Sequence, residues 1–201
     1  MENENLPGTT RVEAFSDGVM AVAITILVLE IKLPHLNSDV SDTDALLAMK
    51  ALLPQIFTFI LSFVMLAIFW VNHHQFMHSI SSVNRSVLWL NNHLLFWLCL
   101  IPFPTAFLGD QPFLKTAVGL FAACMFCAAV SFFLLRWYAL TKSQLTHQHI
   151  SNDYIKTSLR KSAIAPILYA ISIAGAFISV YISYAIFIAV PLLFFLPQKH
   201  K

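Results

Sequence analysis

The chain has 201 residues, of which 58% are hydrophobic and only 11% are charged. A soluble domain carries about 25% charged residues, so this composition excludes a soluble protein. The net charge of +2 is too small to indicate binding to nucleic acid. The length leaves room for about six membrane-spanning helices of roughly 20 residues each, and for no separate soluble domain. We therefore expect an all-α integral membrane protein in which residues 1–201 form a single transmembrane domain of six helices.

Uncharged stretches define the expected spans. Residues 162–198 carry no formal charge, and one helix of that length would be about 55 Å long. The hydrocarbon core of a bilayer is about 30 Å thick, so this stretch must form two helices, which we expect to divide near residues 179–183. The expected spans are residues 12–33, 51–72, 86–108, 113–137, 162–180 and 183–197.

The distribution of basic residues predicts the orientation. An even number of spans places both termini on one side of the membrane. If that side is the cytoplasm, all of the 12 lysines and arginines lie on it except Lys32, Lys50 and Lys115. Short cytoplasmic loops carry an excess of lysine and arginine. The sequence therefore predicts that both termini are cytoplasmic.

The first span combines an aspartate, Asp17, with an apolar run. On a helical wheel that starts from Asp17, a narrow stripe lies between about 80° and 140° and consists of Gly18, Val22, Thr25 and Leu29, with Ile26 at its edge. Ordinary packing against another helix is the commoner fate of such a stripe. The alternative is a pore lining, in which Val22, Ile26 and Leu29 form hydrophobic rings and Thr25 supplies a ring of hydroxyls between them.

Asp17 also has two interpretations. An ionisable residue inside a membrane is by default a functional hypothesis, such as an ion site or a proton carrier. It could instead be a structural anchor that accepts hydrogen bonds from Arg11 or from other helices, and its position roughly 110° from the stripe favours the anchor. Ser16 adds a hydroxyl beside it. Candidate donors at the same depth end the second span and begin the third: Trp70, Asn72, His73, His74, Trp89, Asn91, Asn92 and His93.

The histidines raise the question of a metal site. His73, His74 and His78 lie close together in the sequence, and His93 follows in the third span. Their spacing suits no single helical face, and no H-E-x-x-H motif is present. We therefore expect no bound metal, no cofactor and no catalytic residues. The chain also lacks the backbone-carbonyl selectivity loop of most potassium channels.

Four motifs carry a resemblance to a known family. They are Arg11-x-x-x-Phe15-Ser16-Asp17-Gly18-Val19, Trp70-x-x-His73-His74, Asn91-Asn92-His93-Leu94-Leu95 and Pro102-Phe103-Pro104-Thr105. Together they resemble the signature of the prokaryotic transmembrane-protein-175 potassium channels, which are relatives of the endolysosomal potassium channel of animals. The resemblance runs through the first three spans. It agrees with the length of the chain and with six expected spans.

The resemblance implies a leak-type, potassium-permeable channel in the plasma membrane of a prokaryote, assembled as a homotetramer. In this family the first helix lines the pore, and bulky aliphatic residues form its constriction. The constriction maps onto Val22, with Ile26 and Leu29 further along and a threonine layer at Thr25. Val22 stands where relatives often have isoleucine or leucine, so its ring would be wider. The residues that resemble the family's structural network are Arg11, Phe15, Ser16, Asp17, Trp70, His73, His74, Asn92 and His93.

We therefore expect a potassium-selective channel in which K+ sheds part of its hydration at the aliphatic rings, below an acidic outer mouth of Asp39, Asp42 and Asp44, with Glu30 nearby. A first alternative is a proton-coupled transporter or proton channel that uses Asp17 and His74. A second is a metal- or haem-binding membrane enzyme that uses His73, His74, His78 and His93.

Overall fold

The structure, a computed structural model, describes residues 7–33, 40–142, 145–147 and 150–195. These residues are helical apart from turns, short extended segments and one isolated β-bridge between Ile80 and Thr146. The elements in chain order are α1 (Thr10–Ile26), the 3-10 turn η1 (Leu27–Glu30), α2 (Asp42–Ala51), α3 (Leu53–Met77), α4 (Arg85–Leu100), α5 (Pro102–Asp110), α6 (Lys115–Thr141), α7 (Asn152–Ile178) and α8 (Val180–Phe195).

Several of these helices suit a membrane. Within the described part of the chain, 5 segments are long and apolar enough to cross one: Thr10–Glu30, Leu53–Met77, Arg85–Asp110, Lys115–Thr141 and Asn152–Ile178. A shorter apolar helix follows at Val180–Phe194. The all-α membrane architecture expected from composition therefore agrees with the structure.

Capping residues and a proline make some helix ends differ from those of the expected spans. The acidic segment after the first span forms α2, because the Ser41 hydroxyl caps its first turn by accepting from the Asp44 amide at 3.2 Å. Likewise Ser151 caps α7 at the Tyr154 amide, 3.1 Å away, so that helix begins at Asn152 instead of residue 162. The third span divides at Ile101, because Pro102 has no amide hydrogen with which to continue the ladder of α4.

The last apolar stretch folds back on itself. α7 ends at Ile178, Ser179 is its extended C-cap residue, and α8 begins at Val180, at the start of the segment where the sequence predicts a break. The two helices approach closely at Gly175, where an added Cβ would lie 2.8 Å from the Ile182 side chain. The Ser183 hydroxyl closes the corner by donating to the Ser172 carbonyl at 2.8 Å.

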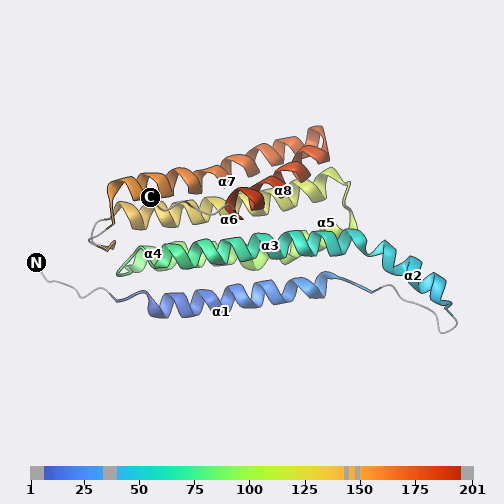
Figure 1. Ribbon diagram of the computed structural model, residues 1–201, viewed down its shortest axis with the longest axis horizontal. Coiled ribbons are helices and arrows are strands. Elements are labelled where there is room, and N and C mark those ends of the chain that lie inside the picture. The colour runs from blue at the N-terminus through green and yellow to red at the C-terminus, as the bar shows by residue number, and fades with distance from the viewer. Residues whose placement is uncertain (1–6, 34–39, 143–144, 148–149, 196–201) are drawn as a thin grey trace, which may run out of the picture.

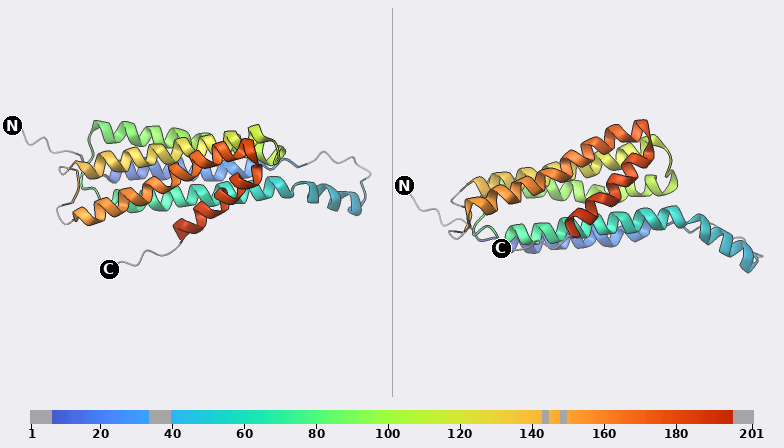
Figure 2. Two further views of the ribbon diagram at one scale, coloured as in Figure 1. Left: turned by 90° about the horizontal axis from the view of Figure 1, so that it is seen from above. Right: turned by 45° about the horizontal axis from the view of Figure 1, so that its top comes forward.

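The helices form a bundle in which α6 is central and α1 is peripheral (Figure 1). α6 packs against α7 and α4, and it supplies many of the fully buried side chains of the core. α8 turns back from the end of α7 and runs obliquely towards α3 (Figure 2). α1 contacts α3 and α4 along one side only. Its other side is therefore left on the outside of the subunit.

Candidate functional site

The two faces of α1 differ sharply in burial. One face packs into the subunit through Val12, Ser16, Met20, Ala23 and Leu27. The opposite face is uncovered: Val22 is 56%, Ile26 39% and Leu29 71% exposed. Gly18 and Thr25 are exposed on the same side. The stripe expected from the helical wheel is thus the face that the described residues of this subunit leave without a packing partner.

Thr25 is oriented in a way that suits a cation. Its hydroxyl donates to the Val22 carbonyl of its own helix at 2.9 Å. A hydroxyl oxygen has two lone pairs, and donation of its proton to the helix leaves them directed outward. The uncovered face therefore presents an acceptor oxygen one turn after Val22.

The helix tightens at the end of the stripe. Residues Leu27–Glu30 form a 3-10 turn, which advances about 120° per residue in place of 100°. Three such steps rotate Leu29 by about 60° relative to its place on an α-helical wheel, and bring it into line with Ile26. Ile26 and Leu29 therefore stand above one another on the uncovered face. A wheel with α-helical spacing throughout separates them.

Asp17 lies at the flank between the two faces and is tied to α3. Its carboxylate accepts a hydrogen bond from the Trp70 indole N–H at 2.9 Å. The Trp70 ring stacks on His74 with a centroid distance of 5.9 Å, and His74 Nε2 lies 3.2 Å from His78 Nε2. The partner of Asp17 in the structure is therefore the end of the second expected span.

A buried chain of hydrogen bonds lies behind α1. The Asn91 side-chain amide donates to the Ser16 hydroxyl at 2.9 Å, and its oxygen lies 2.8 Å from His73 Nε2. Since that oxygen is an acceptor, His73 donates through Nε2. All three side chains are buried, and they join α1, α4 and α3 at one level. The sequence predicts Asn91 as a candidate donor but does not include it in the family network, whereas Asn92, which that network includes, is exposed.

Three other residues of the predicted network face elsewhere. Arg11 is exposed at the start of α1, and no ion pair or hydrogen bond joins it to Asp17 in the described part of the chain. The two residues lie six positions apart, which turns their side chains about 120° apart on a helix. Phe15 lies on the uncovered face and is 56% exposed. His93 faces α6, where its Nδ1 lies 3.0 Å from the Ser131 hydroxyl.

The predicted acidic mouth is only partly described. Asp42 and Asp44 lie in the first turn of α2, which extends beyond the end of the bundle (Figure 1). Asp39 lies outside the described residues. Sequence reasoning missed a link at the end of α1: the Lys32 amide donates to the Gln55 side-chain oxygen at 3.0 Å, and Gln55 donates to Asp110 at 3.0 Å. No spacing in the sequence connects these three residues, which come from the segment after η1, from α3 and from α5.

Comparison with known proteins identifies the family. The family model of the endosomal/lysosomal potassium channel TMEM175 matches residues 11–102. A potassium channel from Chryseobacterium sp. (strain P1-3) is 33% identical over 192 residues, which cover 94% of this chain and 93% of that protein. The chain belongs to the TMEM175 family. A second relative, a potassium channel of Chamaesiphon minutus, is 33% identical over 178 residues, which cover 87% of this chain and 87% of that protein.

The fold agrees with this TMEM175 assignment. The crystal structure of a lysosomal potassium-selective channel TMEM175 homolog from Chamaesiphon minutus superposes with a TM-score of 0.81 at 31% identity. The match covers 92% of this chain and 95% of that one. The TMEM175 family is one of ion channels and not of enzymes. Its matched region includes α1, α3 and α4, the three helices that hold Ser16, Asn91 and His73.

The histidines of this TMEM175 family member take part in hydrogen bonds and ring contacts. His73 bonds to Asn91, His74 stacks on Trp70 and meets His78, and His93 contacts Ser131 and accepts from the Trp97 indole. Among the described residues, no group of three His, Cys, Asp or Glu side chains is placed to hold a metal ion.

Proposed function

We propose that the protein is a potassium-selective, leak-type channel that assembles as a homotetramer, with the uncovered face of α1 lining the pore. The relatives that cover nearly the whole chain are potassium channels. The observation that carries the proposal for this chain is the exposure of Val22, Ile26 and Leu29 on a helix whose other face is fully packed.

The composition of this face favours contact with other copies over contact with lipid. Gly18 and Ala21 lie beside Val22 on it, and both are exposed. Small residues let helices approach closely within a membrane. Thr25 adds an outward oxygen, which would find no polar partner among lipid chains but can contact a partly dehydrated cation.

Permeation follows from this arrangement. Four Val22 side chains form the narrowest ring, and Ile26 and Leu29 form further aliphatic rings along the axis. A cation sheds part of its hydration there, aided by Thr25 oxygens, and the rings gate by dewetting when water leaves them. Asp42 and Asp44, with Asp39 and Glu30, raise the local concentration of cations at the outer mouth.

The orientation and location form part of the proposal. Both termini lie in the cytoplasm, and the protein resides in the cell membrane. The excess of lysine and arginine on the side of the termini supports this orientation. In it, α2 lies outside and the Asp17–Trp70 pair lies near the cytoplasmic end of the pore helix.

Asp17 acts as an anchor in this account. Its hydrogen bond from Trp70 fixes the flank of α1, while the Ser16–Asn91–His73 chain fixes the back. The proton-transport alternative needs a relay between Asp17 and His74. Trp70 lies between the two side chains, and an indole N–H can donate but has no acceptor through which to pass a proton onward. The structure thus favours the anchor over the relay.

A valine pair supplies a matched test. Val22→Ala widens the proposed ring, whereas Val71→Ala makes the same change on α3, at a side chain that is 43% exposed. In planar-bilayer recordings with K+ and Na+, we expect wild-type currents that prefer K+. Val22→Ala should raise the conductance or weaken the preference, and Val71→Ala should do neither. Equal behaviour of the two variants would contradict the assignment of Val22.

A further inference from the structure

A cavity lies away from the proposed pore face of α1, between α3, α6, α7 and α8. Its volume is about 190 Å³, and its lining is rich in hydrogen-bonding side chains, among them Asn72, Gln75, Thr157 and Ser158. Arg136 and Lys161 line the same cavity. One water needs roughly 10–15 Å³ of such space, so the cavity is more than ten times larger than a single water requires.

Arg136 is a cation with no acidic side chain among its described contacts. Its guanidinium donates one hydrogen bond, to the Ser158 hydroxyl, and its Nε atom is buried without a partner. The rings of Phe132 and Phe76 lie 5.3 Å and 5.8 Å from the guanidinium carbon. No aspartate or glutamate belongs to the described lining of the cavity.

A partly buried charge of this kind calls for an anion. A guanidinium has five N–H donors, and the described contacts engage one of them. Aromatic rings compensate only part of the cost of removing a cation from water. The remaining donors, together with Lys161, make the cavity electropositive, and a phosphate group matches a planar guanidinium through paired hydrogen bonds.

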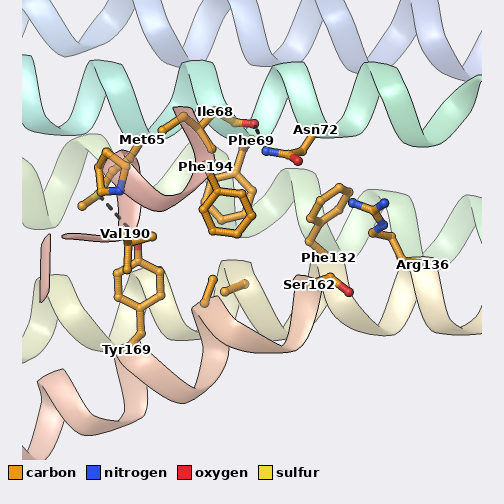
Figure 3. A pocket seen from close by; sticks show the side chains of 13 residues that line it. Met65, Ile68, Phe69, Asn72, Phe132, Arg136, Ser162, Tyr169, Val190 and Phe194 are labelled. Carbon is orange, nitrogen blue, oxygen red and sulfur yellow. Dashed lines mark hydrogen bonds between the residues drawn. The ribbon is translucent and has the colours of Figure 1, made fainter. Parts of the chain in front are cut away.

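An apolar cleft adjoins the charged cavity. The cleft is narrow, about 40 Å³, and shares Asn72, Arg136, Ser162 and Phe194 with the larger cavity. Figure 3 shows Arg136 and Ser162 at one end of it and Tyr169 at the other, with Phe194 between them. Met65, Phe69 and Val190 complete its apolar walls. A charged chamber that continues into an apolar cleft suits an amphiphile with an anionic head and a hydrocarbon tail.

The position of the cavity also suits a lipid. Ile164 and Leu193 line it and are 42% and 50% exposed, so its rim reaches the outer surface of the subunit. It lies between the last turns of α3 and α6 and the first turns of α7. In the orientation proposed above this end faces the cytoplasm, where anionic lipids attract basic pockets between membrane helices.

We infer that this cavity binds an anionic phospholipid, with the phosphate against Arg136 and Lys161 and the start of an acyl chain in the cleft beside Phe194 and Tyr169. The bound lipid supplies the counter-charge of Arg136 and joins α3, α6, α7 and α8. The inference goes beyond the proposed channel function and does not depend on which residue forms the constriction.

Native mass spectrometry of the full-length protein in detergent tests the inference. The probes are dioctanoyl phosphatidylglycerol, dioctanoyl phosphatidylcholine and inorganic phosphate, each titrated separately and in competition. We expect saturable binding of phosphatidylglycerol at one molecule per subunit, and at least tenfold weaker binding of phosphatidylcholine. Equal binding of the two lipids would overturn the inference. Displacement of phosphatidylglycerol by an equal concentration of inorganic phosphate would identify a free-anion site and overturn it as well.

Four variants locate the binding site. Arg136→Gln should weaken phosphatidylglycerol binding at least tenfold and Lys161→Gln about fivefold. Arg160→Gln is the matched control, because Arg160 is an exposed neighbour that does not line the cavity. The affinity of this variant for phosphatidylglycerol should stay within about twofold of the wild-type value. Ala165→Leu fills the apolar cleft without a change of charge and should weaken binding about tenfold.

If Arg136→Gln does not fold, Lys161→Gln and Ala165→Leu decide alone. Elution as a single species on size exclusion checks that each variant is folded. Equal losses in Arg160→Gln and Lys161→Gln, or unchanged binding in both Lys161→Gln and Ala165→Leu, would place the lipid elsewhere.

Discussion

Asn91 connects three helices, and its replacement by leucine isolates the energy of that connection. The change keeps a side chain of similar volume on α4, but it removes both the donor to Ser16 and the acceptor of the His73 N–H. All three side chains are buried, so no water replaces the lost partners. We expect the variant to fold with a lower free energy of unfolding.

The size of this loss in the free energy of unfolding depends on whether each group left without a partner can form another hydrogen bond. The Ser16 hydroxyl can turn to a carbonyl of its own helix one turn back, which limits its cost. The His73 ring packs against Phe76 and Phe132, so its N–H has no such alternative. An unsatisfied buried donor costs about 1–3 kcal/mol, and hydrogen bonds within membrane bundles average about 0.6 and reach about 1.7 kcal/mol. The expected loss is about 1–2 kcal/mol.

Reversible unfolding in mixed micelles with increasing SDS, followed by circular dichroism, measures this loss. Asn92→Leu is the matched control, because Asn92 is the exposed neighbour, and it should change the free energy of unfolding by less than about 0.5 kcal/mol. The double variant His73→Leu/Asn91→Leu removes both partners and should be about 1 kcal/mol more stable than the sum of the single changes predicts. An equal loss in Asn92→Leu, or strict additivity in the double variant, would refute the reasoning.

Two further predictions concern the anchor and the helix contacts. Asp17→Asn turns the charge-assisted hydrogen bond from Trp70 into a neutral one. We expect the variant to lower the fraction of assembled protein on size exclusion more than it changes the unitary conductance. Normal assembly with altered selectivity would instead assign Asp17 to permeation. Gly109→Ala places a Cβ 2.9 Å from the Thr58 hydroxyl and should destabilise the protein by about 1–3 kcal/mol in SDS unfolding. Gly119→Ala, where the nearest atom lies 3.5 Å away, should leave stability unchanged or raise it by up to about 1 kcal/mol.

The exposed stripe on α1 could be predicted because it depends on helical periodicity alone. Val22, Thr25 and Ile26 lie on one side of a helix whatever the rest of the chain does, and the structure leaves that side uncovered. Leu29 shows the limit of the method. The wheel assumes α-helical spacing, whereas the 3-10 turn at the end of α1 rotates this residue into line with Ile26.

The partners of the network could be predicted only in part. Composition indicates that Trp, Asn and His side chains gather near Asp17, but it does not choose between Asn91 and Asn92. Periodicity offers a signal that the sequence-based prediction did not use. Asn91 shares its helical face with Leu94, Leu95 and Leu98, which are all buried, so the inward asparagine can be found by counting turns.

The Arg136 cavity had no sequence signal of its own. In the sequence Arg136 is one of many basic residues that support the positive-inside orientation. The environment of Arg136 depends on how α3, α7 and α8 pack around the end of α6. The residues that line the cavity come from these four helices and lie as far apart in the sequence as Asn72 and Phe194. Such a site depends on tertiary packing, which the spacing of residues along a chain does not encode. Helix ends were displaced for a different reason, since capping by Ser41 and Ser151 extended helices into segments expected to be loops.

Access to position 22 from the ion pathway tests the central claim most directly. Cys99, Cys124 and Cys127 are first replaced by alanine, and Val22→Cys and Val71→Cys are then introduced separately into that background. K+ flux through proteoliposomes is measured before and after addition of silver ions, which react with thiols. If α1 lines the pore at Val22, silver blocks the flux of Val22→Cys and leaves that of Val71→Cys unchanged. Full K+ flux through silver-treated Val22→Cys would contradict the account.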